Sequence, residues 1–168
     1  FREGQQEVVE KILAGQSALA IFPTGSGKSL CYQFSATQLP CLTLVVSPLI
    51  ALIQDQLAFL RAKNIPAASL DSTLSFEQYR QVVQDVKDNK LKILMVSVER
   101  FKNERFRQLL EGINISLLVV DEAHCISEWG HNFRPDYLKL PSFQRTFDIP
   151  QALLLTATAT KPVKQDMA

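Results

Sequence analysis

Short apolar runs alternate with amphipathic stretches along the chain. Runs rich in leucine and β-branched residues lie at 17–22, 42–47, 67–70, 93–97, 117–121 and 152–156. Their apolar residues mostly follow one another instead of alternating with polar ones, which is typical of strands buried on both faces of a parallel sheet. We therefore predict that these runs are the strands of one sheet.

The intervals between these runs carry helical periodicity. Apolar residues three and four positions apart mark two helical stripes, each of which should pack onto the sheet. One stripe comprises Leu49, Leu52, Ile53, Leu57 and Leu60, and the other comprises Phe76, Tyr79, Val82, Val83 and Val86. Because strand and helix alternate throughout, the sequence predicts a three-layer α/β fold with a mostly parallel central sheet.

Composition limits the partners that this domain can have. The 168 residues suffice for one domain with a continuous core, and 18 basic against 17 acidic side chains leave a net charge of +1. Any contact with nucleic acid must therefore be local. Three scattered cysteines favour an intracellular protein without a disulfide scaffold, and the apolar runs are far shorter than the roughly 20 residues of a membrane helix. Since the chain begins at Phe1 and stops in a charged segment, we expect a piece of a longer protein.

A glycine-rich loop joins the first predicted strand to a helical stretch. It reads Pro23-Thr24-Gly25-Ser26-Gly27-Lys28-Ser29. The glycines let successive N–H groups turn inward, and the next helix directs its positive dipole end at the same point. Lys28 can reach the outer phosphates, and the Ser29 hydroxyl can ligate Mg²⁺. A plain glycine turn would not need lysine and serine in this order. The loop therefore predicts a nucleoside triphosphate site, for ATP above all, although Phe22 stands where the usual motif opens with glycine.

An acidic pair, Asp121-Glu122, follows the apolar run at 117–120. Asp121 would hold Mg²⁺, and Glu122 would orient and deprotonate the water that attacks the γ-phosphate. An acidic pair that closes a strand is, by itself, more often a helix cap. The phosphate loop upstream favours the catalytic interpretation.

Aromatic residues are interleaved with polar ones shortly afterwards. Trp129, Phe133 and Tyr137 alternate with small, polar and proline residues, a composition that cannot form a buried strand. Aromatic residues more often belong to a core, but here an exposed loop is favoured. Aromatic faces stack on unpaired bases, and Arg134 can meet a phosphate or a base.

With Ala123 and His124 the acidic pair spells Asp-Glu-Ala-His, and the segment as far as Tyr137 resembles the RecQ family of ATP-dependent DNA helicases. The resemblance covers essentially the whole chain, in the order of that family's first RecA-like lobe, a P-loop NTPase domain. It implies that Arg2 and Gln5 contact adenine. It also implies that His124 relays between nucleotide and DNA loop, which is favoured over a role as metal ligand. The segment containing Trp129, His131, Phe133 and Arg134 is similar to the aromatic loop that couples single-stranded DNA binding to hydrolysis.

Other segments resemble motifs that contact DNA or couple to it in this family. Ser47 and Pro48 lie in a motif Ia-like segment, Ser72 follows Leu70-Asp71, and Thr156-Ala157-Thr158 resembles motif III. The family usually has asparagine where Asp71 stands and proline where Val98 stands. Both departures weaken the assignment of individual DNA contacts and leave the ATP site untouched.

The resemblance implies one lobe, residues 1–168, of a DNA repair or recombination helicase that couples ATP hydrolysis to single-stranded DNA translocation and duplex unwinding. Its partners would be single-stranded or duplex-junction DNA and a second RecA-like lobe, with no membrane. The isolated lobe should bind ATP but hydrolyse it poorly. The protein would lie in the nucleoid-containing cytoplasm of a bacterium or in a eukaryotic nucleus. A nucleotide-switched module acting on RNA or protein remains an alternative, and a small-molecule kinase is disfavoured by the Asp-Glu-Ala-His segment.

Overall fold

A six-stranded parallel sheet forms the centre of the protein. The computed structural model describes residues 5–21, 29–47, 50–70, 74–121 and 140–156. Within them the strand order is β1-β6-β5-β2-β4-β3, and every pairing is parallel. The strands are β1 (Ala18–Ile21), β2 (Leu42–Val46), β3 (Ala67–Leu70), β4 (Ile93–Val96), β5 (Ile115–Val120) and β6 (Ala152–Thr156). All the predicted strands and the parallel three-layer architecture are therefore confirmed.

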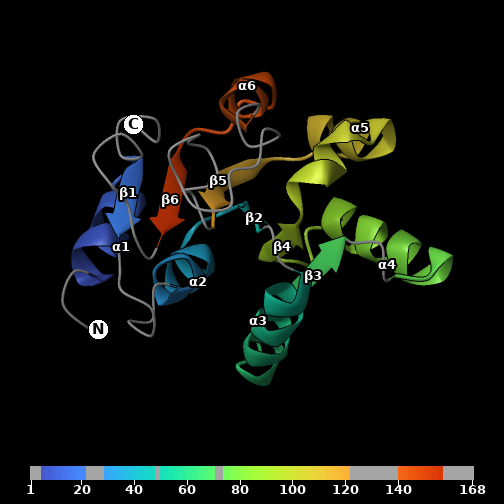
Figure 1. Ribbon diagram of the computed structural model, residues 1–168, viewed down its shortest axis with the longest axis horizontal. Helices are drawn as coiled ribbons and strands as arrows, with labels where there is room; N and C mark the ends of the chain where they lie inside the picture. Colours follow the sequence, from blue (N-terminus) through green and yellow to red (C-terminus); the bar gives the residue numbers. More distant parts are fainter. Residues whose placement is uncertain (1–4, 22–28, 48–49, 71–73, 122–139, 157–168) are drawn as a thin grey trace.

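Helices cover both faces of this sheet, as Figure 1 shows. One face carries α1 (Gln5–Leu13), α2 (Ser29–Gln38) and α3 (Ile50–Ala62). The other carries α4 (Phe76–Lys87), the 3-10 helix η1 (Val98–Lys102), α5 (Glu104–Glu111) and α6 (Leu140–Thr146). No helix in the described part of the chain has the length and apolar character needed to cross a membrane.

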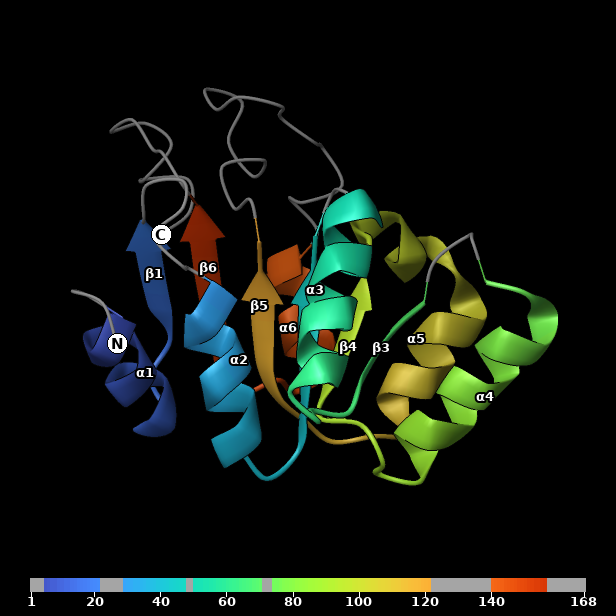
Figure 2. The ribbon, with the colours of Figure 1, turned by 90° about the horizontal axis from the view of Figure 1, so that it is seen from below.

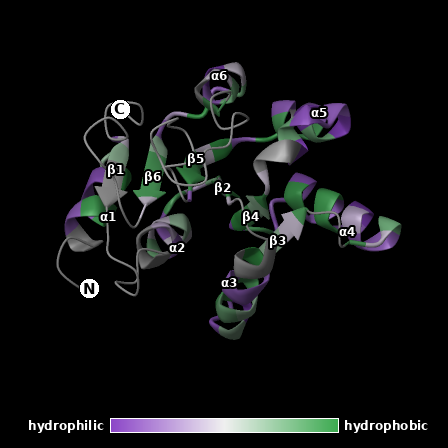
Figure 3. Cartoon of the chain, viewed as in Figure 1, coloured by the Kyte–Doolittle hydropathy of each residue, from purple (hydrophilic) through white to green (hydrophobic). Residues whose placement is uncertain are grey.

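Alternate residues of each strand face the two helical layers. Leu118 and Val120 of β5 belong to the apolar cluster beneath α4, α5 and α6, whereas Leu117 and Val119 belong to the cluster beneath α1, α2 and α3. Both faces are buried, so the strands are apolar on successive residues. Figure 3 shows this hydrophobic centre, with hydrophilic residues on the outer side of α5.

The fifth strand begins earlier than its apolar run predicts. It starts at Ile115, which pairs with Leu42, and the register shifts between Leu42 and Thr43. The polar residue Ser116 interrupts the run, which explains why the pattern misses these positions. Its hydroxyl accepts a hydrogen bond of 3.0 Å from the backbone N–H of Cys41, so a polar side chain is accommodated at this buried place.

The stripe predicted for α4 is correct only in part. Burial increases along the helix, from Phe76 at 70% exposure through half-buried Tyr79 and Val83 to Val86 at 4%. The prediction that Phe76 packs onto the sheet is therefore wrong. From Tyr79 onward α4 packs against the core, whereas the ring of Phe76 lies 5.7 Å from the guanidinium of Arg80.

Local sequence signals fix where the helices on this face begin. Ser75 caps α4 in a capping box with Gln78, and the Asn103 side chain accepts a hydrogen bond of 3.0 Å from the N–H of Phe106 at the start of α5. Behind that cap, Phe101 packs edge-on against Phe106 and stacks on Phe143 of α6. These aromatic contacts join η1, α5 and α6 into one layer.

Candidate functional site at the carboxyl edge of the sheet

The carboxyl ends of all six strands lie along one edge of the sheet, where the arrowheads point in Figure 2. The predicted phosphate loop follows β1, and the predicted acidic pair follows β5. A single strand, β6, lies between these two. Ligands of open α/β sheets bind at this edge, outside the carboxyl ends of the strands. The fold therefore brings the starting points of both predicted motifs to the edge where a ligand is expected.

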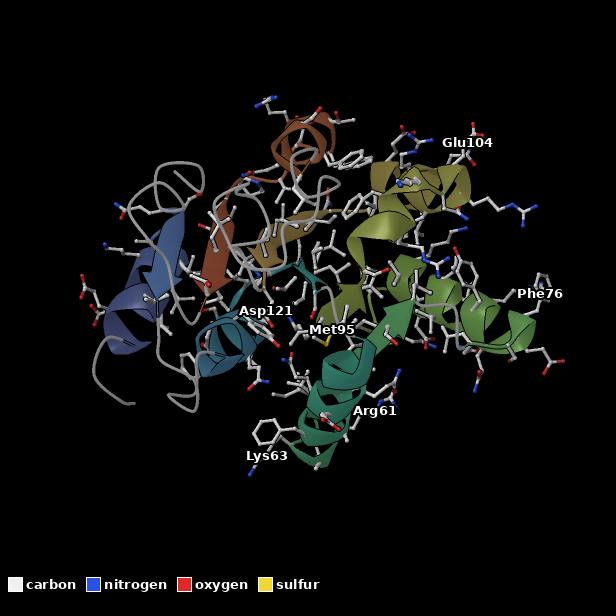
Figure 4. All side chains as sticks on the ribbon, viewed as in Figure 1. Arg61, Lys63, Phe76, Met95, Glu104 and Asp121 are labelled. Carbon is white, nitrogen blue, oxygen red and sulfur yellow. The ribbon has the colours of Figure 1, made fainter. Side chains whose placement is uncertain are left out.

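Asp121 is the first residue after β5 and is 1% exposed. Its backbone N–H donates a hydrogen bond of 2.9 Å to the carbonyl of Val46, which extends the pairing of β5 with β2 by one step. In Figure 4, Asp121 lies near the middle of the molecule, whereas Phe76 and Glu104 lie at its periphery. The carboxylate is thus attached to a rigid central strand.

Ser47 lies one strand away, at the matching position after β2. Val46 pairs with Val120, so the next residues, Ser47 and Asp121, are level with one another. The N–H of Ser47 donates a hydrogen bond of 3.0 Å to the carbonyl of Val96, and its side chain is buried. The Ser47 hydroxyl has no hydrogen-bond partner in the described structure. A buried hydroxyl without a partner is uncommon and is expected where a ligand or a moving segment supplies one.

Thr156 ends β6 and is fully buried. It pairs with Ile21, the last residue of β1 before the phosphate loop. On its other side, β6 pairs with β5 as far as Val120. Thr156 therefore lies on the strand that separates the two predicted nucleotide motifs.

Two predicted nucleotide-binding residues open helices. Ser29 is the first residue of α2, directly after the phosphate loop, and Gln5 is the first residue of α1. The helical stretch predicted directly after the glycine-rich loop is confirmed by α2. Because α2 starts where the loop ends, the positive end of its dipole is directed toward the loop.

Many protein families bind ligands at the carboxyl edge of a parallel sheet, and comparison with known families identifies the one to which this chain belongs. The family model for DEAD/DEAH box helicases matches residues 2–166. The chain belongs to the DEAD/DEAH box helicase family. Within this family, the predicted resemblance to RecQ helicases is confirmed by relatives that match almost the entire chain.

Three such helicase relatives come from two bacteria and a plant. The probable ATP-dependent DNA helicase RecS of Bacillus subtilis is 44% identical over 99% of this chain and 34% of its own length. The ATP-dependent DNA helicase RecQ of Haemophilus influenzae is 44% identical over 99% of this chain and 27% of its own length. The ATP-dependent DNA helicase Q-like 5 of Arabidopsis thaliana is 43% identical over 95% of this chain and 18% of its own length. The chain thus spans about a third or less of the relatives that it matches.

Solved helicase structures share the fold. The Mycobacterium smegmatis helicase Lhr, bound to ssDNA and AMP-PNP, superposes with a TM-score of 0.75 at 24% identity, over 98% of this chain and 23% of that one. The DUF1998 helicase MrfA bound to DNA gives a TM-score of 0.76 at 21% identity, over 99% of this chain and 26% of that one. The fold is that of a RecA-like helicase domain.

Most of the predicted helicase site lies outside the described residues, and for Ser29 and Gln5 the backbone alone is described. The roles of all these residues stay predictions. Those outside the described ranges are Arg2, Pro23, Thr24, Gly25, Ser26, Gly27, Lys28, Pro48, Ser72, Glu122, His124, Trp129, His131, Phe133, Arg134 and Thr158.

Proposed function

We propose that this chain is the ATP-binding lobe of a RecQ-like DNA helicase, which couples ATP hydrolysis to movement along single-stranded DNA and to duplex unwinding. One observation carries the proposal. In a chain that matches the DEAD/DEAH box helicase family over residues 2–166, buried Asp121 follows β5 on the edge from which the phosphate loop leaves β1. ATP binding and the acidic pair can therefore act together.

The phosphate loop and Asp121 would bind ATP with Mg²⁺. Backbone N–H groups of residues 23–29 would cradle the phosphates, and Lys28 would reach the outer ones. The Ser29 hydroxyl and the Asp121 carboxylate are hard oxygen donors, which Mg²⁺ prefers. The described residues contain no group of three or more His, Cys, Asp or Glu side chains that could hold a metal by themselves. Bound Mg²⁺ would neutralise charge on the reacting phosphates.

Residues around these two motifs would complete the reaction. Arg2 and Gln5 would select adenine, and Gln5 opens α1. Glu122, next to Asp121, would orient the attacking water and accept its proton. His124 would relay the state of the nucleotide toward the aromatic loop.

DNA would run along the same edge of the sheet. Trp129 and Phe133 would stack on unpaired bases, while His131 and Arg134 would contact the strand. Ser47 supports this path because its buried hydroxyl lies level with Asp121 and has no partner among the described residues. The proposed contact and coupling positions are completed by Pro48, Ser72, Thr156 and Thr158.

Hydrolysis would need a second RecA-like lobe. The chain spans only 34% of the Bacillus subtilis relative and 27% of the Haemophilus influenzae one, so residues 1–168 are assigned to one lobe. A single lobe offers one side of a cleft, and an arginine from the opposite side would stabilise the transition state. Such a protein would work where chromosomal DNA is, in the cytoplasm of a bacterium or the nucleus of a eukaryote.

The proposal is tested by comparing the isolated chain with the full-length protein. ATP binding is measured by calorimetry, and hydrolysis is measured with and without single-stranded DNA, with Lys28→Ala as the control that loses the phosphate contact. We expect the isolated chain to bind ATP and turn it over feebly, while the full-length protein is strongly stimulated by DNA. Vigorous DNA-stimulated hydrolysis by the isolated, monomeric chain would contradict the one-lobe assignment.

A further inference from the structure

A groove of about 630 Å³ lies between α4 and α5. Its apolar floor consists of Tyr79 and Val83 from α4, Leu109 from α5, and Ile113 just beyond α5. Leu109 is buried, and the other three are half-buried and pack against the core beneath. A concave apolar surface built on two packed helices can accept a large apolar side chain without first rearranging.

The charge of this groove has one sign. Arg80, Lys87 and Arg105 are exposed and line it, and no carboxylate is among the described residues that do so. None of the three forms an ion pair with a carboxylate in the described part of the chain. Since the 168-residue chain carries a net charge of only +1, this concentration of cations without ion pairs is a local feature. It favours an anionic partner.

Carboxylates lie on the same two helices but do not line the groove. Asp85 and Asp88, on the same helix and at its end, accept hydrogen bonds of 2.8 and 3.0 Å from Gln81 and Gln84. One oxygen of each carboxylate is thus engaged along the helix surface. The positive charge of the groove remains available to a partner.

Phe76 extends the apolar surface beyond the floor. It lines the groove at the start of α4 and is 70% exposed, more than the other large hydrophobic side chains that are exposed in the described structure. A large apolar residue left in water beside an apolar hollow is typical of a docking site. Its ring is also held near the guanidinium of Arg80, so apolar and cationic groups adjoin at this end.

The groove is remote from the proposed nucleotide edge. It lies beside β4 and β3, whereas β1 and its phosphate loop belong to the opposite end of the strand order (Figure 1). Phe76 and Glu104 in Figure 4 mark this outer end of the molecule. Its occupant is therefore expected to differ from the ATP of the phosphate loop.

We propose that this groove binds an acidic peptide segment of a partner protein, with large apolar side chains on the floor and carboxylates facing Arg80, Lys87 and Arg105. The cations alone would suit nucleic acid equally well. The aliphatic floor favours a peptide over nucleic acid, because the sugar and phosphate groups of a nucleic acid would leave Val83, Leu109 and Ile113 uncovered. Apolar anchors supply most of the affinity in such interfaces, while rim charges steer the partner and set its orientation.

The test uses the full-length protein and a fluorescein-labelled synthetic peptide in which aspartates flank a Leu-Phe pair. A matched peptide has Ser-Ser in place of Leu-Phe, and a labelled single-stranded oligonucleotide is the third probe. The combined variant Arg80→Glu/Lys87→Glu/Arg105→Glu reverses the rim. The control Arg61→Glu/Lys63→Glu reverses exposed cations at the end of α3, on the other face of the sheet.

We expect the Leu-Phe peptide to bind, and to bind at least about tenfold more weakly to the rim variant, which corresponds to about 1.4 kcal/mol. The α3 control should bind it normally, and the Ser-Ser peptide should bind poorly throughout. Phe76→Ala should also weaken binding of the Leu-Phe peptide. Because this side chain is exposed, the single variant should remain folded, and it still tests the groove if circular dichroism shows the rim variant to be unfolded. Equal binding of both peptides, or unchanged binding by a folded rim variant and by Phe76→Ala, would overturn the proposal. So would a result in which the rim variant loses oligonucleotide binding while the Leu-Phe peptide never binds.

Discussion

The backbone N–H of Asp121 donates a hydrogen bond of 2.9 Å to the carbonyl of Val46. This bond continues the β5–β2 pairing beyond the last strand residue and sets Asp121 level with Ser47. A proposed magnesium ligand and a proposed DNA-side residue are therefore held by neighbouring central strands. If both proposed roles hold, the paired strand ends would form a short structural route between nucleotide and DNA.

Asp121→Asn tests the proposed magnesium ligand. The amide keeps the size of the side chain and leaves the backbone bond to Val46 in place, but it removes the negative charge. We expect DNA-stimulated ATP hydrolysis by the full-length protein to fall at least about 100-fold, the scale of losing one group that stabilises charge in the transition state. Circular dichroism should show a folded protein.

The neighbouring variant Glu122→Gln is the matched control, because its proposed role is proton transfer instead of metal binding. It should also lose hydrolysis but should retain magnesium-dependent ATP binding, which Asp121→Asn should weaken. Normal hydrolysis by a folded Asp121→Asn protein would refute the role assigned to Asp121.

Ser47→Ala separates function from stability. The Ser47 hydroxyl is buried and has no partner in the described structure, so its removal should leave the free energy of unfolding unchanged or raise it by about 1 kcal/mol. If the hydroxyl meets DNA or a moving segment, stimulation of hydrolysis by single-stranded DNA should nevertheless fall. Urea unfolding and hydrolysis assays measure the two effects. A loss of stability with unchanged stimulation would show a purely structural hydroxyl.

Phe106→Ala tests the packing of the α5 layer. Phe106 is fully buried and packs edge-on against Phe101, so its truncation should lower the free energy of unfolding by about 3–5 kcal/mol. Phe76→Ala, which removes a ring that is 70% exposed, should change it by less than about 0.5 kcal/mol. Urea unfolding monitored by circular dichroism measures both. Similar losses in the two variants would contradict the observed burial.

Much of the fold could be predicted because its strands are buried on both faces. The run at 117–121 predicted the end of β5 and the position of Asp121, and the phosphate loop predicted the helix that starts at Ser29. Other features depend on distant parts of the chain. Ile115 pairs with Leu42, which belongs to a strand far away in sequence. Helical periodicity alone also does not reveal that Phe76 lies outside the core. The groove between α4 and α5 was missed for the same reason, since Phe76 had been assigned to the interior.

Trp129→Ala tests the proposed aromatic loop. Loss of the indole should remove stacking worth about 1–3 kcal/mol per base, and it should uncouple DNA from hydrolysis without abolishing ATP binding. Hydrolysis by the full-length protein is measured over a range of single-stranded DNA concentrations, with ATP binding measured in parallel. Stimulation equal to that of the unaltered protein would exclude Trp129 from the coupling loop.

Strand separation by the full-length protein tests the central claim most directly. A forked DNA duplex with one labelled strand is incubated with Mg²⁺ and ATP, and release of the strand is followed for the unaltered protein and for Lys28→Ala. We predict ATP-dependent release that the Lys28→Ala protein lacks. Absence of release by an unaltered protein that still binds and hydrolyses ATP would contradict a DNA helicase and favour a nucleotide-switched module acting on RNA or protein.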